Sequence, residues 1–307
     1  MRAAILRSAG AEPQLGEFDE PVAGDGQAVL DVSVAGVNPI DIRLASGQLG
    51  PPRVPSIVGL ESVGTLADGR RVYCGSSISP YGSWAPRTLI DPERAFPVAD
   101  GLDDALAVAL GISGIAAWLA LEHDAEVRRG ESVLVLGATG TVGRIAVQIA
   151  KLLGAGRVVA AARHADALAE VERLGADSSV VMGRGDDAQA LREAAGDGFD
   201  VVIDPLYGKP FEAALPATAP GARVVTLGES AGPVASVAFR ALQGRTHIGA
   251  GIGFVARELV RDAYEKLTQH AAEGRISVEI ERFPLDHAID AWRAQAHSPR
   301  RKLVIEP

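Results

Sequence analysis

Ser132-Val-Leu-Val-Leu-Gly-Ala-Thr-Gly-Thr-Val-Gly143 is the stretch that decides the fold, because a short apolar run leads straight into glycines. The residues that follow, 144–151, have the spacing of an amphipathic helix. A buried strand, a glycine-rich turn and a helix in this order are typical of a phosphate-binding turn. There the free N–H groups and the positive dipole end of the helix face an anion.

The turn has the pattern A-x-G-x-x-G, with Ala138 where the dinucleotide-binding fingerprint has its first glycine. We expect Gly140 to let the backbone approach a pyrophosphate and Gly143 to allow close packing of helix on strand. A plain tight turn is the alternative. The expected cofactor contacts in this turn are Ala138, Thr139, Gly140, Thr141, Val142 and Gly143.

The end of the next apolar run indicates which dinucleotide binds. An Asp or Glu there hydrogen-bonds the ribose 2′-hydroxyl of NAD, whereas a basic residue accommodates the 2′-phosphate of NADP. This run reads Val158-Val-Ala-Ala-Ala-Arg163 and has no carboxylate at its tip. Arg163, with His164 beside it, stands 20 residues beyond Gly143, so the sequence favours NADP(H). The alternative is an ordinary helix start that happens to carry an arginine.

From Ser132 onward, short apolar runs alternate with helical patterns, as in a doubly wound parallel sheet. The predicted strands are Ser132 to Leu136, Arg157 to Ala161, Ser179 to Met182, Val201 to Ile203 and Arg223 to Leu227. The predicted helices between them are Val142 to Leu153, Ala165 to Leu174, Ala188 to Ala195 and Phe211 to Ala217. The first 100 residues instead show short β-branched runs broken by Gly and Pro, which indicates an irregular β domain.

Composition restricts the function classes. The chain has 307 residues, of which 47% are hydrophobic, and a net charge of −9, so it is globular and a poor match for nucleic acid or anionic membranes. The single cysteine, Cys74, cannot form an internal disulfide, and we expect a cytoplasmic protein. Ala105 to Leu121 carries no charge but is short for a membrane span, and we interpret it as a buried helix.

Several further motifs occur in a family-specific order. They are Gly36-Val-Asn-Pro-Ile-Asp41, Val58-Gly-Leu-Glu-Ser-Val-Gly64, Gly69-Arg-Arg-Val-Tyr73, Tyr81-Gly-Ser-Trp-Ala85, Leu110-Gly-Ile-Ser-Gly-Ile-Ala-Ala-Trp118, Leu174-Gly-Ala-Asp177 and Lys302-Leu-Val-Ile305. With the glycine turn, they make the whole chain resemble the medium-chain dehydrogenase/reductase superfamily, in its zinc-independent quinone oxidoreductase branch. The resemblance implies a GroES-like catalytic β domain from residues 1–113 and 255–307. A Rossmann NADP(H)-binding domain would occupy residues 114–254.

The resemblance also allows a test for metal. In zinc-dependent relatives two cysteines and a histidine hold the catalytic ion. The matching positions here are Asn38, Leu60 and Ile112, none of which is a zinc ligand. Four cysteines hold the structural ion of those relatives, whereas this chain has one, and its six histidines lack metal-ligand spacing. We therefore expect no metal.

Without a Lewis acid, the oxygen that receives negative charge must be stabilised by hydrogen-bond donors. Quinones and enones suit this chemistry because conjugation spreads the charge. By the resemblance, Asn38 is the first catalytic candidate. The alternative is that Asn38 has only a structural role, because Asn-Pro is an ordinary turn former. Asp41 is a second candidate, although bracing of the turn is the simpler role for it. Glu61 is expected to pair with a basic residue such as Arg301. Many relatives have a tyrosine where this chain has Arg43, so the proton donor is unassigned.

Glycines are also expected on the nicotinamide side of the cofactor, where a missing side chain lets a flat ring approach. The candidates are Gly228 and Gly251, and ordinary turns are the alternative. The resemblance further suggests a homodimer joined at the segment Arg245 to Gly253. Two other functions stay open: a non-catalytic NADPH-binding structural or regulatory protein, and a metal-free alcohol dehydrogenase.

Overall fold

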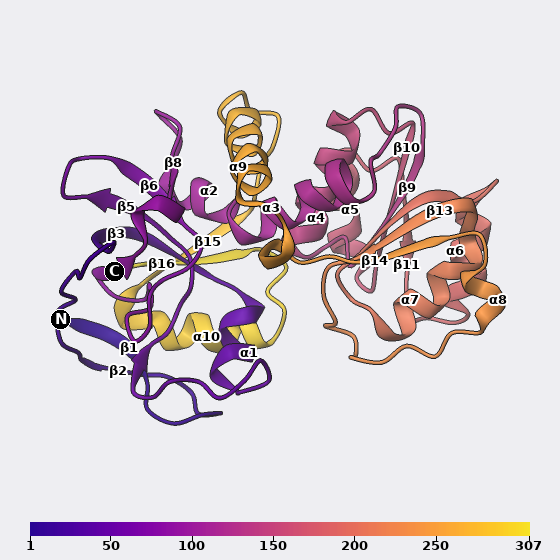
Figure 1. The fold of residues 1–307 in the computed structure, drawn as a ribbon. Coiled ribbons are helices and arrows are strands. Elements are labelled where there is room, and N and C mark those ends of the chain that lie inside the picture. Colours follow the sequence, from indigo (N-terminus) through magenta and orange to yellow (C-terminus); the bar gives the residue numbers. More distant parts are fainter. The chain divides into compact units, whose positions relative to one another are not determined.

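The computed structural model describes all 307 residues, and they divide into two units. Residues Met1–Ile112 and Tyr264–Pro307 form the first unit, and Ser113–Ala263 form the second (Figure 1). The chain returns to the first unit inside helix α9 (Arg257–Ala272), at Tyr264, whereas the resemblance implied a return at residue 255. The reason lies in Tyr264, whose ring stacks on Tyr73 of the first unit with 4.6 Å between centroids.

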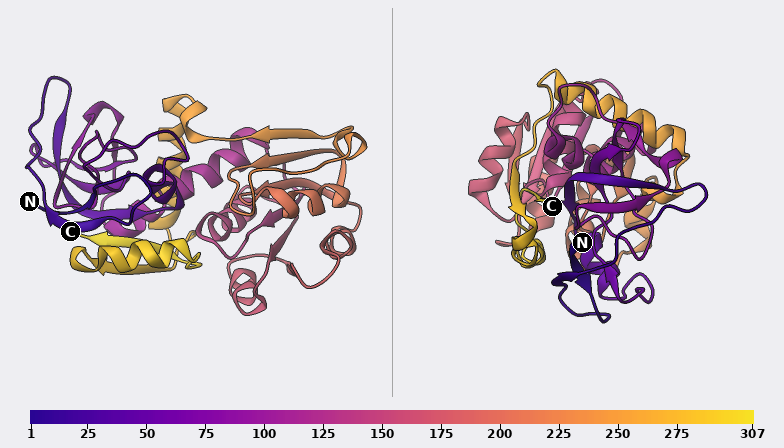
Figure 2. Two further views of the ribbon diagram at one scale, coloured as in Figure 1. Left: turned by 90° about the horizontal axis from the view of Figure 1, so that it is seen from below. Right: turned by 90° about the vertical axis from the view of Figure 1, so that its left-hand side faces the viewer.

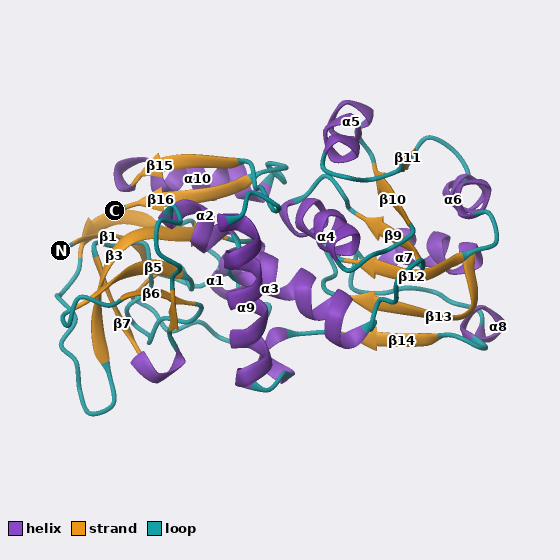
Figure 3. Cartoon of the chain, turned by 90° about the horizontal axis from the view of Figure 1, so that it is seen from above, coloured by secondary structure: helices purple, strands orange, loops and turns teal.

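A six-stranded parallel sheet forms the second unit, in the order β11-β10-β9-β12-β13-β14 (Figure 3). The first strand of this unit, β9, is thus central, and the strand order reverses beside it, as in a Rossmann fold. Five strands lie where the apolar runs predicted them; β9 has the predicted bounds, and the other four have shifted ends. The bounds are β9 Ser132–Leu136, β10 Arg157–Ala162, β11 Ser178–Val181, β12 Phe199–Asp204, β13 Thr218–Thr226 and β14 Thr246–Gly249.

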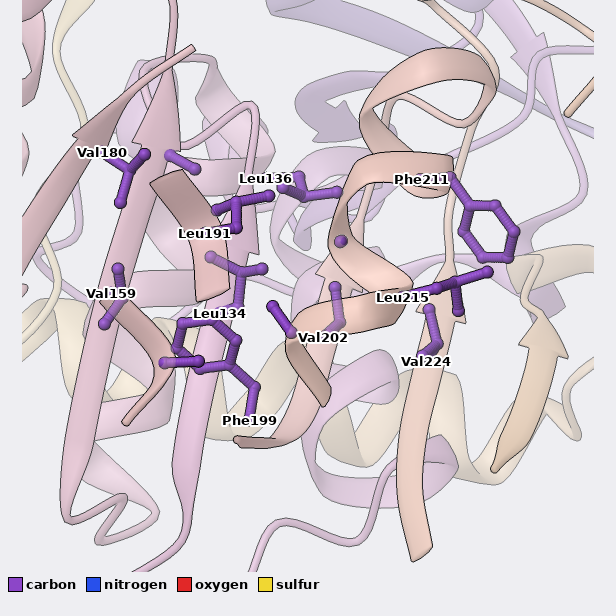
Figure 4. Close-up of a cluster of buried hydrophobic side chains, with 14 of the residues drawn as sticks. Leu134, Leu136, Val159, Val180, Leu191, Phe199, Val202, Phe211, Leu215 and Val224 are labelled. Atoms are coloured by element: carbon purple, nitrogen blue, oxygen red, sulfur yellow. The ribbon is translucent and has the colours of Figure 1, made fainter. Parts of the chain in front are cut away.

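Helices connect these strands and cover the sheet. Their bounds are α3 Ile112–Trp118 with a π-helical turn Leu119–Asp124, α4 Thr141–Leu152, α5 Ala165–Arg173, α6 Asp187–Ala195, α7 Gly208–Ala214 with a 3-10 turn Leu215–Ala217, and α8 Phe239–Leu242. A 3-10 turn, Ile252–Phe254, precedes α9. On one face of the sheet, Leu191 of α6 and Phe211 of α7 belong to one buried apolar cluster with Leu134 and Val202 (Figure 4). This buried core fixes the positions of the strands relative to one another.

Two sheets form the first unit. The smaller has the order β2-β1-β4, with β1 Arg2–Leu6, β2 Gln14–Glu17 and β4 Ser56–Ile57. The larger has the order β15-β16-β3-β5-β6-β8, with β7 also paired to β3. Its bounds are β3 Ala28–Val37, β5 Ser62–Leu66, β6 Arg71–Cys74, β7 Arg87–Ile90, β8 Phe96–Pro97, β15 Ile280–Pro284 and β16 Lys302–Glu306.

The helices of the first unit are short. They are α1 Pro39–Ala45, α2 Asp104–Ala109 and α10 Ala288–Ala296, with 3-10 turns Pro92–Arg94 and Leu285–His287. Strand β16 pairs antiparallel with β3, so that Val304 lies opposite Gly36. Both termini belong to this unit (Figure 2). The last strand is therefore placed beside the segment that leads to Asn38 and α1.

The apolar segment Ala105 to Leu121 is buried as expected, but it is not one helix. It breaks between α2 and α3, at Leu110 and Gly111. The N–H of Ile112 donates to Glu61 Oε2 at 2.7 Å. This N–H therefore does not take part in the hydrogen-bond pattern of one continuous helix. This hydrogen bond between residues 51 positions apart thus interrupts the helix that the apolar run predicted. None of the helices combines the length and the apolar character that crossing a bilayer requires.

Candidate functional site

The glycine turn lies between β9 and α4 in the second unit. A Cβ atom added at Gly143 would lie 2.5 Å from the carbonyl oxygen of Gly137 and 2.6 Å from Ala138 Cα, so close packing of helix on strand requires this glycine. At Gly140 the same atom would meet only the Gly137 oxygen, at 3.5 Å. The fold itself therefore does not require Gly140, which leaves open space on the outer side of the turn.

Hydrogen bonding in the turn leaves the start of α4 free. The N-terminus of α4 begins after Gly140 and has no side-chain cap, and the first N–H groups of a helix have no intrahelical partner. Those of Thr141, Val142 and Gly143 are in this position. Ala138 is different, because its N–H donates to the carbonyl of Ala161 at 3.1 Å and its side chain is fully buried. Ala138 therefore joins the turn to β10.

Arg163 and His164 follow β10 directly, and both are exposed. His164 precedes the first residue of α5 and makes no side-chain cap. Since Ala161 is bonded to Ala138, this end of β10 lies beside the glycine turn. No carboxylate stands between β10 and α5, where a ribose-binding Asp or Glu would be.

Gly228 and Gly251 follow β13 and β14, so they lie at the same carboxyl edge of the sheet as the turn after β9. A Cβ at Gly228 would lie 2.9 Å from the carbonyl oxygen of Pro205, and this glycine is needed for packing as well. Gly251 lines a cavity of about 320 Å³ together with Ile248, Phe254 and Leu259. Ligands of open α/β sheets gather at this edge.

Tyr207, which follows β12, is held in an uncommon conformation. Its φ is +55°, its N–H donates to Asp204 Oδ1 at 3.0 Å, and its ring stacks on His247 with 6.4 Å between centroids. Burial raises the pKa of the Asp204 carboxyl. The stacking partner His247 belongs to β14, so the contact joins the ends of two different strands.

In the first unit, Asn38 belongs to a buried polar network. Its Nδ2 donates to Glu61 Oε1 at 2.7 Å, and its Oδ1 accepts from Lys302 Nζ at 2.7 Å. Lys302 also pairs with Glu61 Oε1 at 2.6 Å, and none of the three residues is more than 2% exposed. A cation on one side and an anion on the other fix the orientation of the Asn38 amide.

Glu61 is the centre of this network. Its Oε2 accepts from the Tyr73 hydroxyl at 2.9 Å and from the Ile112 N–H at 2.7 Å. Burial and the nearby Glu61 carboxylate raise the pKa of Tyr73 well above its ordinary value, so the phenol stays a donor. A Cβ at Gly36 would lie 2.2 Å from Glu61 Oε1, and one at Gly111 would lie 2.4 Å from Oε2. Two glycines thus make room for the carboxylate.

The partner of Glu61 corrects the expectation from the sequence. Arg301 does not reach Glu61; its guanidinium lies 3.5 Å from Glu279 Oε1 and 3.8 Å from Glu281 Oε2, at the surface. Lys302, one residue further, is the first residue of β16 and lies inside. The available signal was the motif Lys302-Leu-Val-Ile305, in which this lysine stands directly before three apolar residues.

Asp41 braces the start of α1. Its Oδ2 accepts the N–H of Asn38 at 2.8 Å, while its Oδ1 is buried without a hydrogen-bond partner. Burial raises the pKa of Asp41 to about 7. The carboxyl therefore holds the backbone of Asn38 in place.

The three positions that the resemblance matched to zinc ligands meet around this network. Asn38 and the Ile112 N–H both contact Glu61, which follows Leu60. The chain has no group of three His, Cys, Asp or Glu side chains close enough to hold a metal ion. Because the Lys302 ammonium already pairs with the Glu61 carboxylate, the side chains at these positions do not fit a zinc ion.

Comparison with known proteins agrees with this architecture. A family model described as zinc-binding dehydrogenase matches residues 141–273, most of which lie in the parallel-sheet unit. Rat quinone oxidoreductase is 33% identical over 220 residues, which are 68% of this chain and 66% of the relative, just under two thirds of its length. The pig quinone oxidoreductase is 28% identical over 298 residues, 91% of this chain and 88% of the relative.

A solved structure is similar along the whole chain. It is that of the quinone oxidoreductase of Thermus thermophilus, determined also as a complex with NADPH, and it is 30% identical with a TM-score of 0.86. The similarity covers 100% of both chains. Fold, strand order and sequence identity point the same way. The chain belongs to the medium-chain dehydrogenase/reductase superfamily, in its quinone oxidoreductase branch.

Proposed function

We propose that this protein is a metal-free, NADPH-dependent reductase of quinones or α,β-unsaturated carbonyl compounds. The observation that carries the proposal is the ion pair between Lys302 and Glu61, which contacts two of the positions matched to zinc ligands, Asn38 and Ile112. A lysine cation neutralises the carboxylate there, so this region offers hydrogen-bond donors in place of a Lewis acid.

The residues of the second unit suit NADPH. The uncapped start of α4 and the open space at Gly140 are fit for a pyrophosphate, and the exposed Arg163 for a 2′-phosphate. We assign the nicotinamide side to Gly228 and Gly251. When bound, NADPH supplies a hydride from its nicotinamide. The NADPH complex of the Thermus thermophilus relative supports this choice of cofactor.

The proposed substrates follow from the donors of the first unit. Reduction places negative charge on an oxygen, and conjugation in a quinone or enone spreads that charge, so that a neutral amide suffices to stabilise it. Asn38 Nδ2 carries two hydrogens, of which one is directed to Glu61 Oε1. We assign the other to the substrate oxygen. Asp41 acts by holding Asn38 in place.

We further propose a homodimer joined at β14. This strand is the edge of the parallel sheet, and edge strands present unpaired backbone groups that can pair with a second chain. Phe254, shortly after β14, is 96% exposed, so an apolar ring is available for a contact beside this edge.

The test is the initial rate of NADPH oxidation by chelator-treated protein with a panel of quinones, cyclic enones and open-chain enones, with NADH in parallel. We expect turnover that prefers NADPH and is insensitive to the chelator. Tight NADPH binding without turnover of any of these acceptors would support a structural or regulatory protein instead. Reduction of NADP⁺ by simple alcohols would contradict the proposed reaction.

A further inference from the structure

Arg144 is a buried cation one residue beyond the last glycine of the turn. It lies in the first part of α4 and is only 6% exposed. Its Nε donates to the carbonyl oxygen of Thr139 at 3.1 Å, and its Nη2 pairs with Glu170 Oε2 at 2.5 Å. A planar guanidinium can make both contacts at once, whereas a lysine ammonium has no such fork.

The first contact fixes the middle of the turn. The peptide group between Thr139 and Gly140 is held at both ends, since its carbonyl accepts from Arg144 and its N–H donates to the Gly137 oxygen at 3.0 Å. The direction of this peptide sets the path of the chain into α4. The free N–H groups at the start of α4 therefore keep one orientation.

The second contact ties the turn to another helix. Glu170 belongs to α5, which begins directly after Arg163 and His164. The hydrogen bond from Arg144 lowers the pKa of the Glu170 carboxyl, so the pair stays charged near neutral pH. Gln148 Nε2 also donates to the Arg144 carbonyl at 3.1 Å, one turn further along α4. The guanidinium thus lies between the glycine turn and α5, which both begin at the carboxyl edge of the sheet.

We propose that Arg144 is a positioning residue that holds the pyrophosphate-binding turn and the helix behind Arg163 in a fixed relation. The inference rests on the proposed function and deepens it. NADPH has to meet the turn with its pyrophosphate and Arg163 with its 2′-phosphate at the same time. NADH lacks the second group, so it depends less on the relation between the two segments. Breaking the link to Glu170 therefore weakens NADPH binding more than NADH binding.

The experiment measures the Kd of NADPH and of NADH, by the fluorescence of the bound nucleotide, for the wild type, R144K, R144M and E170Q. In E170Q we expect the Kd ratio to shift against NADPH by about threefold. In R144M, which also loses the contact with Thr139, we expect the Kd of NADPH to rise by about tenfold. R144K keeps the charge without the fork, and we expect a result between the wild type and R144M.

The matched control is K151M, which breaks the ion pair of Lys151 with Asp177 (3.0 Å) near the other end of α4. It should leave the Kd ratio unchanged, because that pair does not touch the turn. A loss of folding stability alone would lower the melting temperature without changing the ratio. An E170Q ratio equal to that of the wild type would overturn the inference while the proposed function stands. Wild-type protein that binds neither nucleotide would overturn both.

Discussion

Lys302 Nζ lies 2.6 Å from Glu61 Oε1, and both side chains are withdrawn from solvent. Burying either charge alone is costly, but the pair with its additional hydrogen bonds is tolerated. Since Asn38 contacts both partners, the ion pair also decides which way this amide faces. The stability of the first unit and the geometry of its candidate catalytic residue thus depend on the same contact.

Removing the lysine is expected to destabilise the protein strongly. K302M leaves the Glu61 carboxylate buried without its cation, and the free energy of unfolding should fall by about 3–5 kcal/mol. The double variant E61Q/K302M removes both charges and should recover most of this loss. Urea unfolding measures both effects. The control is R301M at the exposed pair with Glu279, and an equal loss in R301M and K302M would contradict the expectation.

The titration of Asp41 should make stability depend on pH. Its pKa is raised from 3.8 to about 7, so between these values the folded protein holds a proton that the unfolded chain has lost. The contribution is fully present below pH 4 and is lost as the pH rises to about 7, by at most about 4 kcal/mol. Urea unfolding at several pH values should show this fall in the wild type.

The variant D41N lacks the titrating group, so its stability should fall less over the same pH range. D25N, at an exposed aspartate, serves as the control and should keep the wild-type profile. Identical profiles for D41N and the wild type would mean that Asp41 is ionised throughout.

The two glycines of the turn should respond differently to alanine. G143A places a methyl group against the Gly137 oxygen and Ala138, and it should lower the melting temperature of the protein. G140A makes only an ordinary contact with the Gly137 oxygen, so the variant should fold normally. It should nevertheless bind NADPH at least tenfold more weakly (~1.4 kcal/mol), because the methyl group fills the space for the pyrophosphate. A G140A variant that binds NADPH like the wild type would argue for a plain turn.

Replacing Arg163 should reduce the preference for NADPH. Without its charge, R163A loses the contact proposed for the 2′-phosphate, and its Kd for NADPH should rise by about tenfold while that for NADH stays close to the wild-type value. The control R173A removes an exposed arginine from the other end of α5. An equal change for both nucleotides would assign Arg163 to a general electrostatic role.

The proposed dimer can be tested at Phe254. Light scattering after size-exclusion chromatography should give twice the chain mass for the wild type. F254D places a charge at the proposed contact and should shift the protein toward the monomer. The control V22D changes another exposed apolar residue, which lies in the first unit and is 81% exposed, and this variant should remain a dimer. A monomeric wild type would refute the proposal.

The parallel sheet could be predicted because its signal is local. Ser132–Leu136 has the predicted bounds, since an apolar run buried on both faces has a clear start and end. Strand β13 begins at Thr218, five residues before the predicted start, because Pro220 and Gly221 at its exposed beginning carry no apolar pattern. The short edge strand β14 is mostly exposed and had no strand signal at all.

The network around Glu61 could not be predicted in the same way. Its contacts join residues 23, 51 and 241 positions away from Glu61 along the chain. Sequence patterns do not report such distances, and the choice between Arg301 and Lys302 depended on where β16 begins. Resemblance to a family brought Asn38, Leu60 and Ile112 together as matched positions, but the presence of Lys302 beside them follows only from the fold.

The late position of Lys302 in the chain also has a consequence for synthesis. Every residue of the second unit leaves the ribosome before Lys302, and domains generally fold as units once their residues are available. The parallel sheet can therefore form before the first unit is complete. At that stage Glu61 has no cation and β3 lacks its partner β16, so the first unit is still open. The first 112 residues must wait for strand β16 before their core can close, and until then part of their apolar surface stays open to solvent.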